Sequence, residues 1–185
     1  FHKIAVIGAG TMGNGIAHVF AQKGFEVNLV DVNQDQLAKA LQTISKNMER
    51  QVTKGTLSAD EKNSAYGRLH TYNTLKEGIH DVALVVEAAT ENTELKLKIF
   101  KELDELAPKE AILASNTSSI SITRIASATS RPEKVIGMHF MNPVPLMKLV
   151  EIINGYATDA GVTESIVALS RQLDKIPCVV NDFPG

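Results

Sequence analysis

The sequence predicts an α/β protein built around a doubly wound, mostly parallel sheet. Short apolar runs alternate with amphipathic stretches of helical length along the 185 residues. The first apolar run, residues 3–7, gives way at once to the glycine-rich segment Gly8–Gly13, and the second apolar run ends at an acid, Asp31. Strands that alternate with helices of this length are typical of a parallel sheet covered by helices on both faces.

The opening elements follow from local patterns. Residues 3–7 fit a strand, the segment after Gly13 a helix, and the run before Asp31 a second strand. Apolar side chains then recur at steps of three and four through residues 34–55, which predicts a long amphipathic helix. A Ser-x-x-Glu pattern soon afterwards indicates the start of another helix. The two helices, at about residues 34–65, form an excursion beyond a minimal nucleotide-binding unit.

The remaining elements continue the alternation. The run Asp81–Ala89 is nearly all apolar, as expected of a central parallel strand that is covered on both faces. Further strands are expected over residues 69–73, 111–115, 134–140, 149–153 and 176–180, and helices over residues 92–107, 120–128 and 163–174.

Composition and charge argue against several classes of protein. With 44% hydrophobic and 22% charged residues, the chain has the make-up of an ordinary globular domain. Its net charge of −2 argues against nucleic-acid binding, which needs a basic face. No apolar run approaches the roughly 20 residues of a membrane span. The sequence therefore predicts neither a nucleic-acid partner nor a membrane one.

The single cysteine, Cys178, rules out an intrachain disulfide and suits a reducing compartment, so we expect a cytoplasmic protein. Cys178 itself is expected to be a small buried residue on a late strand. The final stretch, residues 179–185, stops within a turn signal where another element would begin. We therefore expect the chain to be a piece of a longer protein.

The glycine segment has the spacing of a dinucleotide-binding motif. In such a motif the first glycine makes a tight turn, the second lets the backbone approach a pyrophosphate, and the third lets the helix pack on the strand. The helix N-terminus offers N–H groups and the positive end of its dipole to the phosphates. Asp31 lies 18 residues after Gly13, close to the spacing of a carboxylate that binds the adenosine ribose. This combination predicts a Rossmann-type site.

The charge at the end of the second strand selects the cofactor. NADP needs a basic residue to meet its 2′-phosphate, whereas Asp31 would repel that group. Residues 32–36 contain no arginine that could compensate. The sequence therefore predicts NAD.

Polar side chains gather where the predicted strands end, and ligands of open α/β sheets lie off these ends. Of five histidines, His139 is the candidate acid–base catalyst because it closes such a strand, and Glu151 could fix its tautomer. A tight turn would place His139 opposite Lys148, whereas a wide loop centred on Pro145 would place it opposite Glu151. Two nearby prolines favour the wide loop. The alternative is a surface glutamate and a strand-terminal histidine without a shared role.

The polar run Ser115–Ser119 has two interpretations. It can supply ligand contacts, or Ser118 or Ser119 can cap the helix that follows. Lys54 and Lys96 can likewise neutralise phosphates or lie on solvent-exposed helix faces. No metal-ligand spacing is present in the sequence, since the lone cysteine lacks a partner and no histidine pair occurs at i, i+4 on a helix.

Four motifs span the chain: Gly-Ala-Gly-Thr-Met-Gly at 8–13, Val-Glu-Ala-Ala at 86–89, Ser-Asn-Thr-Ser-Ser at 115–119, and His-Phe-Met-Asn-Pro-Val-Pro-Leu-Met-Lys-Leu-Val-Glu at 139–151. Together they resemble the N-terminal domain of 3-hydroxyacyl-CoA dehydrogenases, and in particular of the bacterial 3-hydroxybutyryl-CoA dehydrogenases. The resemblance covers essentially all 185 residues. It implies NAD-dependent oxidation of an L-3-hydroxyacyl-CoA to the 3-ketoacyl-CoA, or the reverse.

The resemblance also implies roles for individual residues. His139 resembles the general base on the 3-hydroxyl, Glu151 the residue that orients it, and Ser118 the hydroxyl that holds the substrate oxygen near the nicotinamide. Lys54 would contact coenzyme A, as would Asn47, which stands where the family has a serine. The implied cofactor contacts are Gly8, Ala9, Gly10, Thr11, Met12, Gly13, Asp31, Ala88, Glu91, Lys96, Asn116, Ser118 and Asn142.

The family pattern continues beyond Gly185 into a helical domain that completes the active site and mediates dimerisation. The resemblance therefore implies that residues 1–185 are the NAD-binding domain of a homodimer that acts on an acyl-CoA. We expect the chain alone to bind NAD but to turn over substrate poorly. The alternative from a different class is a dinucleotide-binding module without turnover, acting as a sensor or a structural protein.

Overall fold

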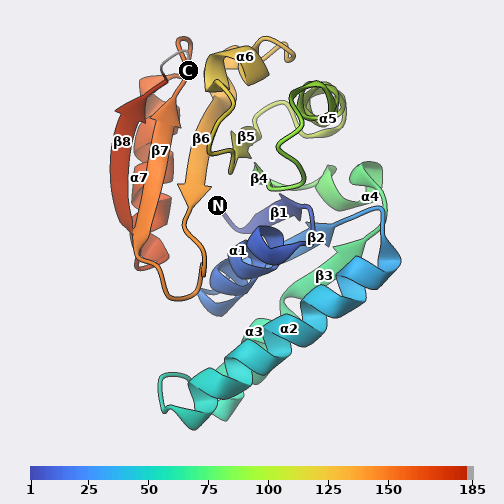
Figure 1. The fold of residues 1–185 in the computed structure, drawn as a ribbon, viewed down its shortest axis with the longest axis vertical. Coiled ribbons are helices and arrows are strands. Elements are labelled where there is room, and N and C mark those ends of the chain that lie inside the picture. The colour runs from blue at the N-terminus through green and yellow to red at the C-terminus, as the bar shows by residue number, and fades with distance from the viewer. Residues whose placement is uncertain (183–185) are drawn as a thin grey trace.

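Eight strands form one sheet in the computed structural model, which describes residues 1–182 (Figure 1). The strands are β1 (Lys3–Ile7), β2 (Glu26–Val30), β3 (Leu69–Tyr72), β4 (Leu84–Glu87), β5 (Ile112–Ser115), β6 (Val135–Phe140), β7 (Leu149–Asn154) and β8 (Ile176–Asn181). Their spatial order is β3-β2-β1-β4-β5-β6-β7-β8, so the chain winds first to one side of β1 and then to the other. This order confirms the predicted doubly wound fold.

Neighbouring strands run parallel, with the exception of the antiparallel pair β6 and β7. The sheet is therefore mostly parallel, as predicted, and its direction reverses at the loop of residues 141–148. Because β1, β2, β4, β5 and β6 point the same way, their carboxyl ends meet at one edge of the sheet. The polar segments singled out in the sequence follow these ends.

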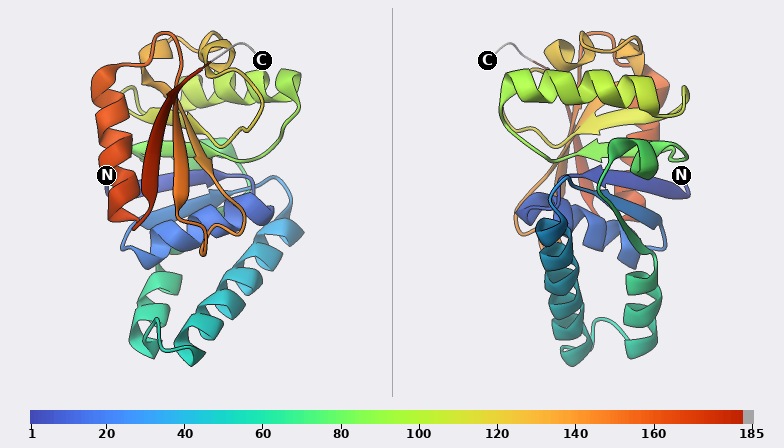
Figure 2. Two further views of the ribbon diagram at one scale, coloured as in Figure 1. Left: turned by 60° about the vertical axis from the view of Figure 1, so that its left-hand side comes forward. Right: turned by 90° about the vertical axis from the view of Figure 1, so that its right-hand side faces the viewer.

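Helices cover both faces of the sheet. They are α1 (Thr11–Gln22), α2 (Gln34–Thr53), α3 (Ala59–Gly67), α4 (Leu75–Ile79), α5 (Thr93–Leu106), α6 (Ile122–Ala126), a 3-10 helix (Pro132–Lys134) and α7 (Ala160–Gln172). One buried apolar cluster joins the sheet to α1 and α7 through residues such as Phe20 and Ile166. A second cluster joins it to α4, α5 and α6 through Ile79, Phe100 and Ile125. Figure 2 shows α5 and α1 on opposite sides of the sheet.

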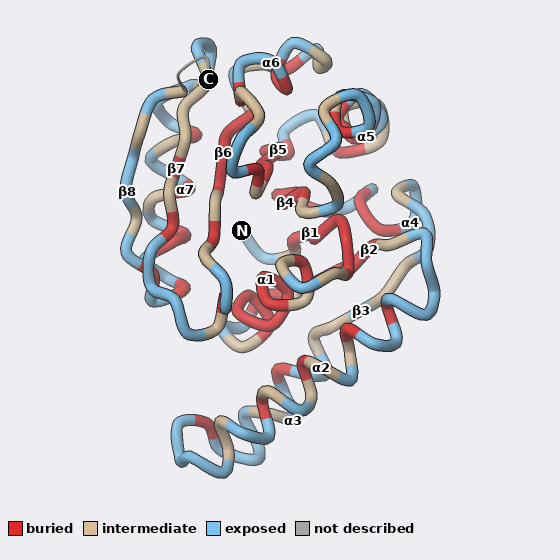
Figure 3. Tube along the Cα trace, viewed as in Figure 1, coloured by how far each residue is buried: buried red, intermediate tan, exposed pale blue. Residues whose placement is uncertain are grey.

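Helices α2 and α3 form a hairpin that projects from the sheet (Figures 1 and 2). Asn33 caps α2 by accepting hydrogen bonds from two first-turn N–H groups, and α3 begins with a capping box between Ser58 and Glu61. Most residues at the far end of the hairpin are exposed (Figure 3). The stripe that packs α2 inward is Leu37, Ala40, Ile44 and Met48.

Two sequence expectations about local structure are wrong. The N-cap of α6 is Ser121, whose side chain accepts from the N–H of Arg124, and it is neither Ser118 nor Ser119. Cys178 is exposed because it lies on β8, the last strand of the sheet, where most residues face solvent. Part of the turn expected at residues 179–185 lies outside the described residues. Among the helices of residues 1–182, none has the length and apolar character needed to cross a membrane.

Candidate active site

The three glycines of the loop between β1 and α1 have three different steric environments. Gly8 has a left-handed φ of +99°, and a Cβ there would lie 2.6 Å from the carbonyl oxygen of Ala88. A Cβ on Gly13 would lie 1.7 Å from the carbonyl oxygen of Gly8, so the helix packs directly on the strand end. A Cβ on Gly10, in contrast, would meet nothing within 4 Å. The loop is therefore packed tightly against backbone atoms at Gly8 and Gly13, whereas Gly10 borders open space.

The N-terminus of α1 presents unpaired donors at this opening. Gly10 caps the helix without a side-chain hydrogen bond, so the first-turn N–H groups around Thr11 and Met12 are directed away from the helix body. Asp31, at the end of β2, accepts hydrogen bonds from the N–H of Ala9 and of Asn33, both at 2.9 Å. Its carboxylate thus fixes the glycine loop and still has acceptor capacity for a ribose hydroxyl.

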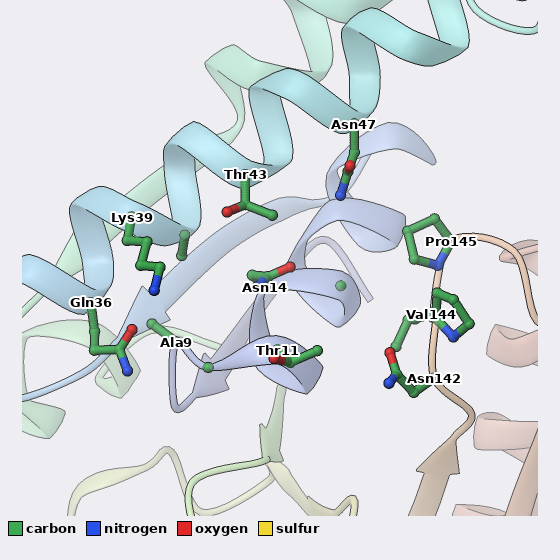
Figure 4. A pocket seen from close by; sticks show the side chains of 14 residues that line it. Ala9, Thr11, Asn14, Gln36, Lys39, Thr43, Asn47, Asn142, Val144 and Pro145 are labelled. Atoms are coloured by element: carbon green, nitrogen blue, oxygen red, sulfur yellow. The ribbon is translucent and has the colours of Figure 1, made fainter.

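Two cavities flank the glycine loop. One of about 310 Å³ lies between α1, α2 and the 141–148 loop (Figure 4). Its lining includes Thr11 and Asn14 from α1, Lys39 and Asn47 from α2, and Asn142. The other, of about 630 Å³, lies between the ends of β1 and β2, the start of α4 and one face of α5. The larger cavity, beside Gly8 and Asp31, suits the adenosine half of a dinucleotide, and the smaller one, between the glycine loop and α2, suits a place where the other half and a second ligand would meet.

His139 and Glu151 lie directly opposite each other on the antiparallel strands β6 and β7. His139 Nδ1 is 3.5 Å from Glu151 Oε1, with side-chain exposures of 20% and 36%. The wide-loop prediction is therefore confirmed, since β6 and β7 are joined by residues 141–148 rather than by a tight turn. With Nδ1 facing the carboxylate, Nε2 remains for a substrate proton.

The Ser115–Ser119 loop is held by its neighbours on both sides. The hydroxyls of Thr117 and Ser119 donate to Glu91 Oε2 at 2.9 and 2.8 Å, which ties this loop to the one after β4. Asn116 Oδ1 accepts from the N–H of Phe140 at 2.8 Å, which ties the loop to the end of β6. Ser118 is exposed between these anchors. The loop is thus fixed while Ser118 stays accessible.

A buried ion pair lies beneath the loops that follow β4 and β5. Lys96 Nζ lies 2.8 Å from Glu87 Oε1, and the two side chains are 1% and 0% exposed. Ser115 Oγ donates to Glu87 Oε1 at 2.7 Å, and Glu87 Oε2 accepts from the N–H of Ala89 at 2.9 Å. The interpretation of Lys96 as a solvent-exposed lysine is wrong. Sequence reasoning also gave no role to Glu87, although it stands in the quoted motif at 86–89 and is an acid inside a buried apolar run.

The remaining predicted residues fall in different places. Ala88 packs its carbonyl against Gly8, and Asn142 and Asn47 line the same 310 Å³ cavity. Lys54 is exposed at the C-terminal cap of α2 and lines a separate hollow on the hairpin. Within residues 1–182, no cluster of three His, Cys, Asp or Glu side chains could hold a metal ion.

The glycine loop, the acid that ends β2 and the polar strand ends define a dinucleotide-binding domain of the dehydrogenase type. The chain belongs to the 3-hydroxyacyl-CoA dehydrogenase family, since residues 3–183 match the model described as "3-hydroxyacyl-CoA dehydrogenase, NAD binding domain". This membership confirms the predicted family resemblance and the choice of NAD. The roles of the individual site residues remain predictions.

Several relatives share nearly the whole chain. It is 50% identical over 183 residues to a 3-hydroxybutyryl-CoA dehydrogenase of Bradyrhizobium diazoefficiens, covering 99% of this chain and 62% of the relative. A probable 3-hydroxybutyryl-CoA dehydrogenase of Bacillus subtilis is 46% identical, with 99% and 63% covered. The crystal structure of (S)-3-hydroxybutyryl-CoA dehydrogenase from Ralstonia eutropha superposes with a TM-score of 0.96 at 42% identity, covering 100% of this chain and 65% of that one. The chain thus spans less than two thirds of these relatives.

Proposed function

We propose that the protein containing this chain catalyses the NAD-dependent oxidation of L-3-hydroxyacyl-CoA, with 3-hydroxybutyryl-CoA as substrate, or the reverse reduction. The observation that carries the proposal is the pairing of His139 with Glu151 on the strand that leads into the cavity wall at Asn142. This pair differs from the surface pair of His70 with Glu26 because its strand leads into a cavity wall, where an imidazole steadied by a carboxylate can serve as a base. The names of the relatives point to the same chemistry.

In this proposal, His139 is the general base. Glu151 faces Nδ1 and favours the tautomer with its proton on that nitrogen, so Nε2 can take the proton of the 3-hydroxyl. The Ser118 hydroxyl, on its anchored loop, would hold the substrate oxygen by a hydrogen bond. NAD⁺, when bound, supplies the hydride acceptor. In the reverse direction the imidazolium returns its proton to the oxygen at C3.

The residues of the glycine loop fit the cofactor. The open space above Gly10 and the first-turn N–H groups of α1 would take the pyrophosphate, and Asp31 the adenosine ribose. Asn116 and Asn142 would lie beside the nicotinamide. Ala88 and Glu91 would act from the loop after β4, and Lys96, on α5, would act chiefly through its buried pair with Glu87.

The acyl-CoA would lie along α2. Asn47 lines the cavity beside the glycine loop, and the exposed Lys54 lies two helical turns further on, beside Lys46 and Arg50. The amide, ammonium and guanidinium groups on this helix, which outnumber the one carboxylate of Glu49 in the hollow, suit the polar and anionic parts of coenzyme A.

We further propose that residues outside this chain complete the enzyme. In the relatives, about a third or more of the length lies outside the matched region. On this proposal the parent protein is a cytoplasmic homodimer, and residues 1–185 alone bind NADH but turn over slowly. Comparable kcat/KM for this chain and the full-length protein would contradict the last statement.

The test of the proposed function is an assay of the full-length protein with acetoacetyl-CoA and NADH or NADPH. The proposal predicts consumption of NADH and a strong preference for it over NADPH. A dinucleotide-binding sensor would bind NADH and show no turnover with any acyl-CoA from C4 to C16.

A further inference from the structure

Lys175 is a buried cation that bonds only to main-chain carbonyl groups. The residue is 7% exposed, and its Nζ donates to the carbonyl oxygens of Val144 and Met147, both at 2.6 Å. Within residues 1–182, no carboxylate lies within ion-pair distance of it. Buried ammonium groups ordinarily pair with an acid. Here the donors are instead directed at two points of the 141–148 loop.

The end of α7 places Lys175 under this loop. Asp174 follows the helix with a left-handed φ of +58°, and the N–H of Lys175 donates to the carbonyl of Ser170 at 3.0 Å. This is the hydrogen-bond pattern of a Schellman C-cap, with Asp174 in the position that glycine usually occupies. A non-glycine residue in that conformation is strained, and the ion pair between Lys23 and Asp174 helps to hold it. The cap turns the chain from α7 into β8, with Lys175 beneath the loop.

The held loop forms one wall of the cavity beside the glycine loop. Asn142 and Val144 line that cavity opposite Thr11 and Asn14 of α1 (Figure 4). Val144 is 2% exposed and packs on Gly15, where a Cβ would lie only 2.8 Å from the Val144 Cβ. The position of the loop against α1 therefore decides where the Asn142 side chain lies relative to the cofactor-binding loop.

We propose that Lys175 is a positioning residue that fixes the 141–148 loop against α1 and thereby sets the place of Asn142 in the cofactor cavity. This inference rests on the proposed function, because Asn142 matters for turnover only if the cavity takes the nicotinamide. Lys175 acts through the loop and touches neither reactant. Burial, together with the neighbouring charges of Lys148 and Lys23, lowers the pKa of Lys175.

The test uses the full-length enzyme with Lys175→Met, which keeps an unbranched apolar side chain and removes the ammonium donors. We expect kcat for acetoacetyl-CoA reduction to fall about tenfold per NADH-binding site, since small displacements of positioning groups are costly. The KM for NADH should stay within twofold, because Asp31 and the glycine loop still hold the other half of the cofactor. The control is Lys101→Met, which removes an exposed lysine charge from α5, on the other face of the sheet from α7, and should leave kcat within twofold.

Lys175→Gln covers the case in which the methionine variant does not fold. The shorter amide can reach at most one of the two carbonyls, so a partial loss of kcat at constant KM for NADH is expected. A purely structural role predicts a lower Tm with unchanged kcat per NADH-binding site, and that result in either variant would overturn the proposal. Absence of activity in the wild-type enzyme would instead refute the proposed function.

Discussion

His139 and Glu151 are direct cross-strand partners, and His139 Nδ1 lies 3.5 Å from Glu151 Oε1. They lie on β6 and β7, which are the one antiparallel pair of neighbouring strands in the described sheet and are connected by the wide loop of residues 141–148. The pair therefore depends on the reversal of strand direction after β6. If the strand next to β6 were parallel to it, the residue opposite His139 would come from another part of the chain.

Glu151→Gln should weaken catalysis without weakening cofactor binding. The amide cannot stabilise the imidazolium that forms when His139 takes a proton, so we expect kcat to fall about 10- to 100-fold. The affinity for NADH, measured by fluorescence titration, should stay within twofold. The matched control is Glu26→Gln, because Glu26 pairs with His70 at 2.8 Å in a surface His–carboxylate contact on β2 and β3. An equal loss of kcat in both variants would contradict the role of Glu151.

Gly10→Ala and Gly13→Ala should fail in different ways. The new methyl group on residue 13 would lie 1.7 Å from the Gly8 carbonyl oxygen, so this variant should lose stability by several kcal/mol or not fold. The methyl group on residue 10 meets no protein atom and occupies the space left for the pyrophosphate, so this variant should fold normally and bind NADH at least tenfold more weakly. Thermal unfolding and NADH titration separate the two effects. Full NADH affinity in Gly10→Ala would exclude the open space as the phosphate site.

Lys96→Met should destabilise the protein by about 3–5 kcal/mol, because it leaves the Glu87 carboxylate buried without its partner. The double variant Lys96→Met with Glu87→Gln should recover part of that loss, since no net charge then remains buried. Urea unfolding at neutral pH measures both. A control is Lys62→Met, whose pair with Glu49 is on the hairpin surface and should cost at most about 1 kcal/mol. Equal losses for Lys96→Met and Lys62→Met would contradict the buried pair.

Asp104 should contribute stability that disappears in acid. Burial acts to raise the pKa of Asp104, but hydrogen bonds from the N–H of Ser130 and from Arg131 outweigh it and hold the pKa below its ordinary value of 3.8. A carboxylate with a lowered native pKa stabilises the fold above its unfolded pKa, and this stabilisation is lost as the pH falls through the native pKa. Urea unfolding below about pH 4 should therefore show a steep loss that is shallower in Asp104→Asn. An identical pH dependence in both proteins would contradict the assignment.

The sequence was sufficient to predict the doubly wound sheet and the facing of His139 and Glu151. Both depend on local signals: the alternation of apolar runs with amphipathic ones, and two prolines that disfavour a tight turn. The capping residue of α6 was mispredicted because several serines in a row satisfy the same local rule, and tertiary packing decides that Ser121 takes the role. Exposure of Cys178 depends on strand order, which places β8 at an edge.

The burial of Lys96 and Lys175 was beyond sequence reasoning for a different reason. A lysine on a helix face or after a helix is normally solvated, and each is buried here by partners distant in the chain. Glu87 is contributed by β4 and the loop carbonyls by residues 144 and 147. Such partners can be identified only from the three-dimensional structure, because they are distant from the lysines in the sequence.

We propose His139 as the base for the 3-hydroxyl, and the variant His139→Gln in the full-length enzyme is the sharpest test of this role. Steady-state reduction of acetoacetyl-CoA by NADH should fall by about 10²- to 10⁴-fold, with NADH affinity within twofold of wild type. His70→Gln, in the surface pair with Glu26, should keep full activity. Retention of more than about a tenth of wild-type kcat in His139→Gln would contradict the claim.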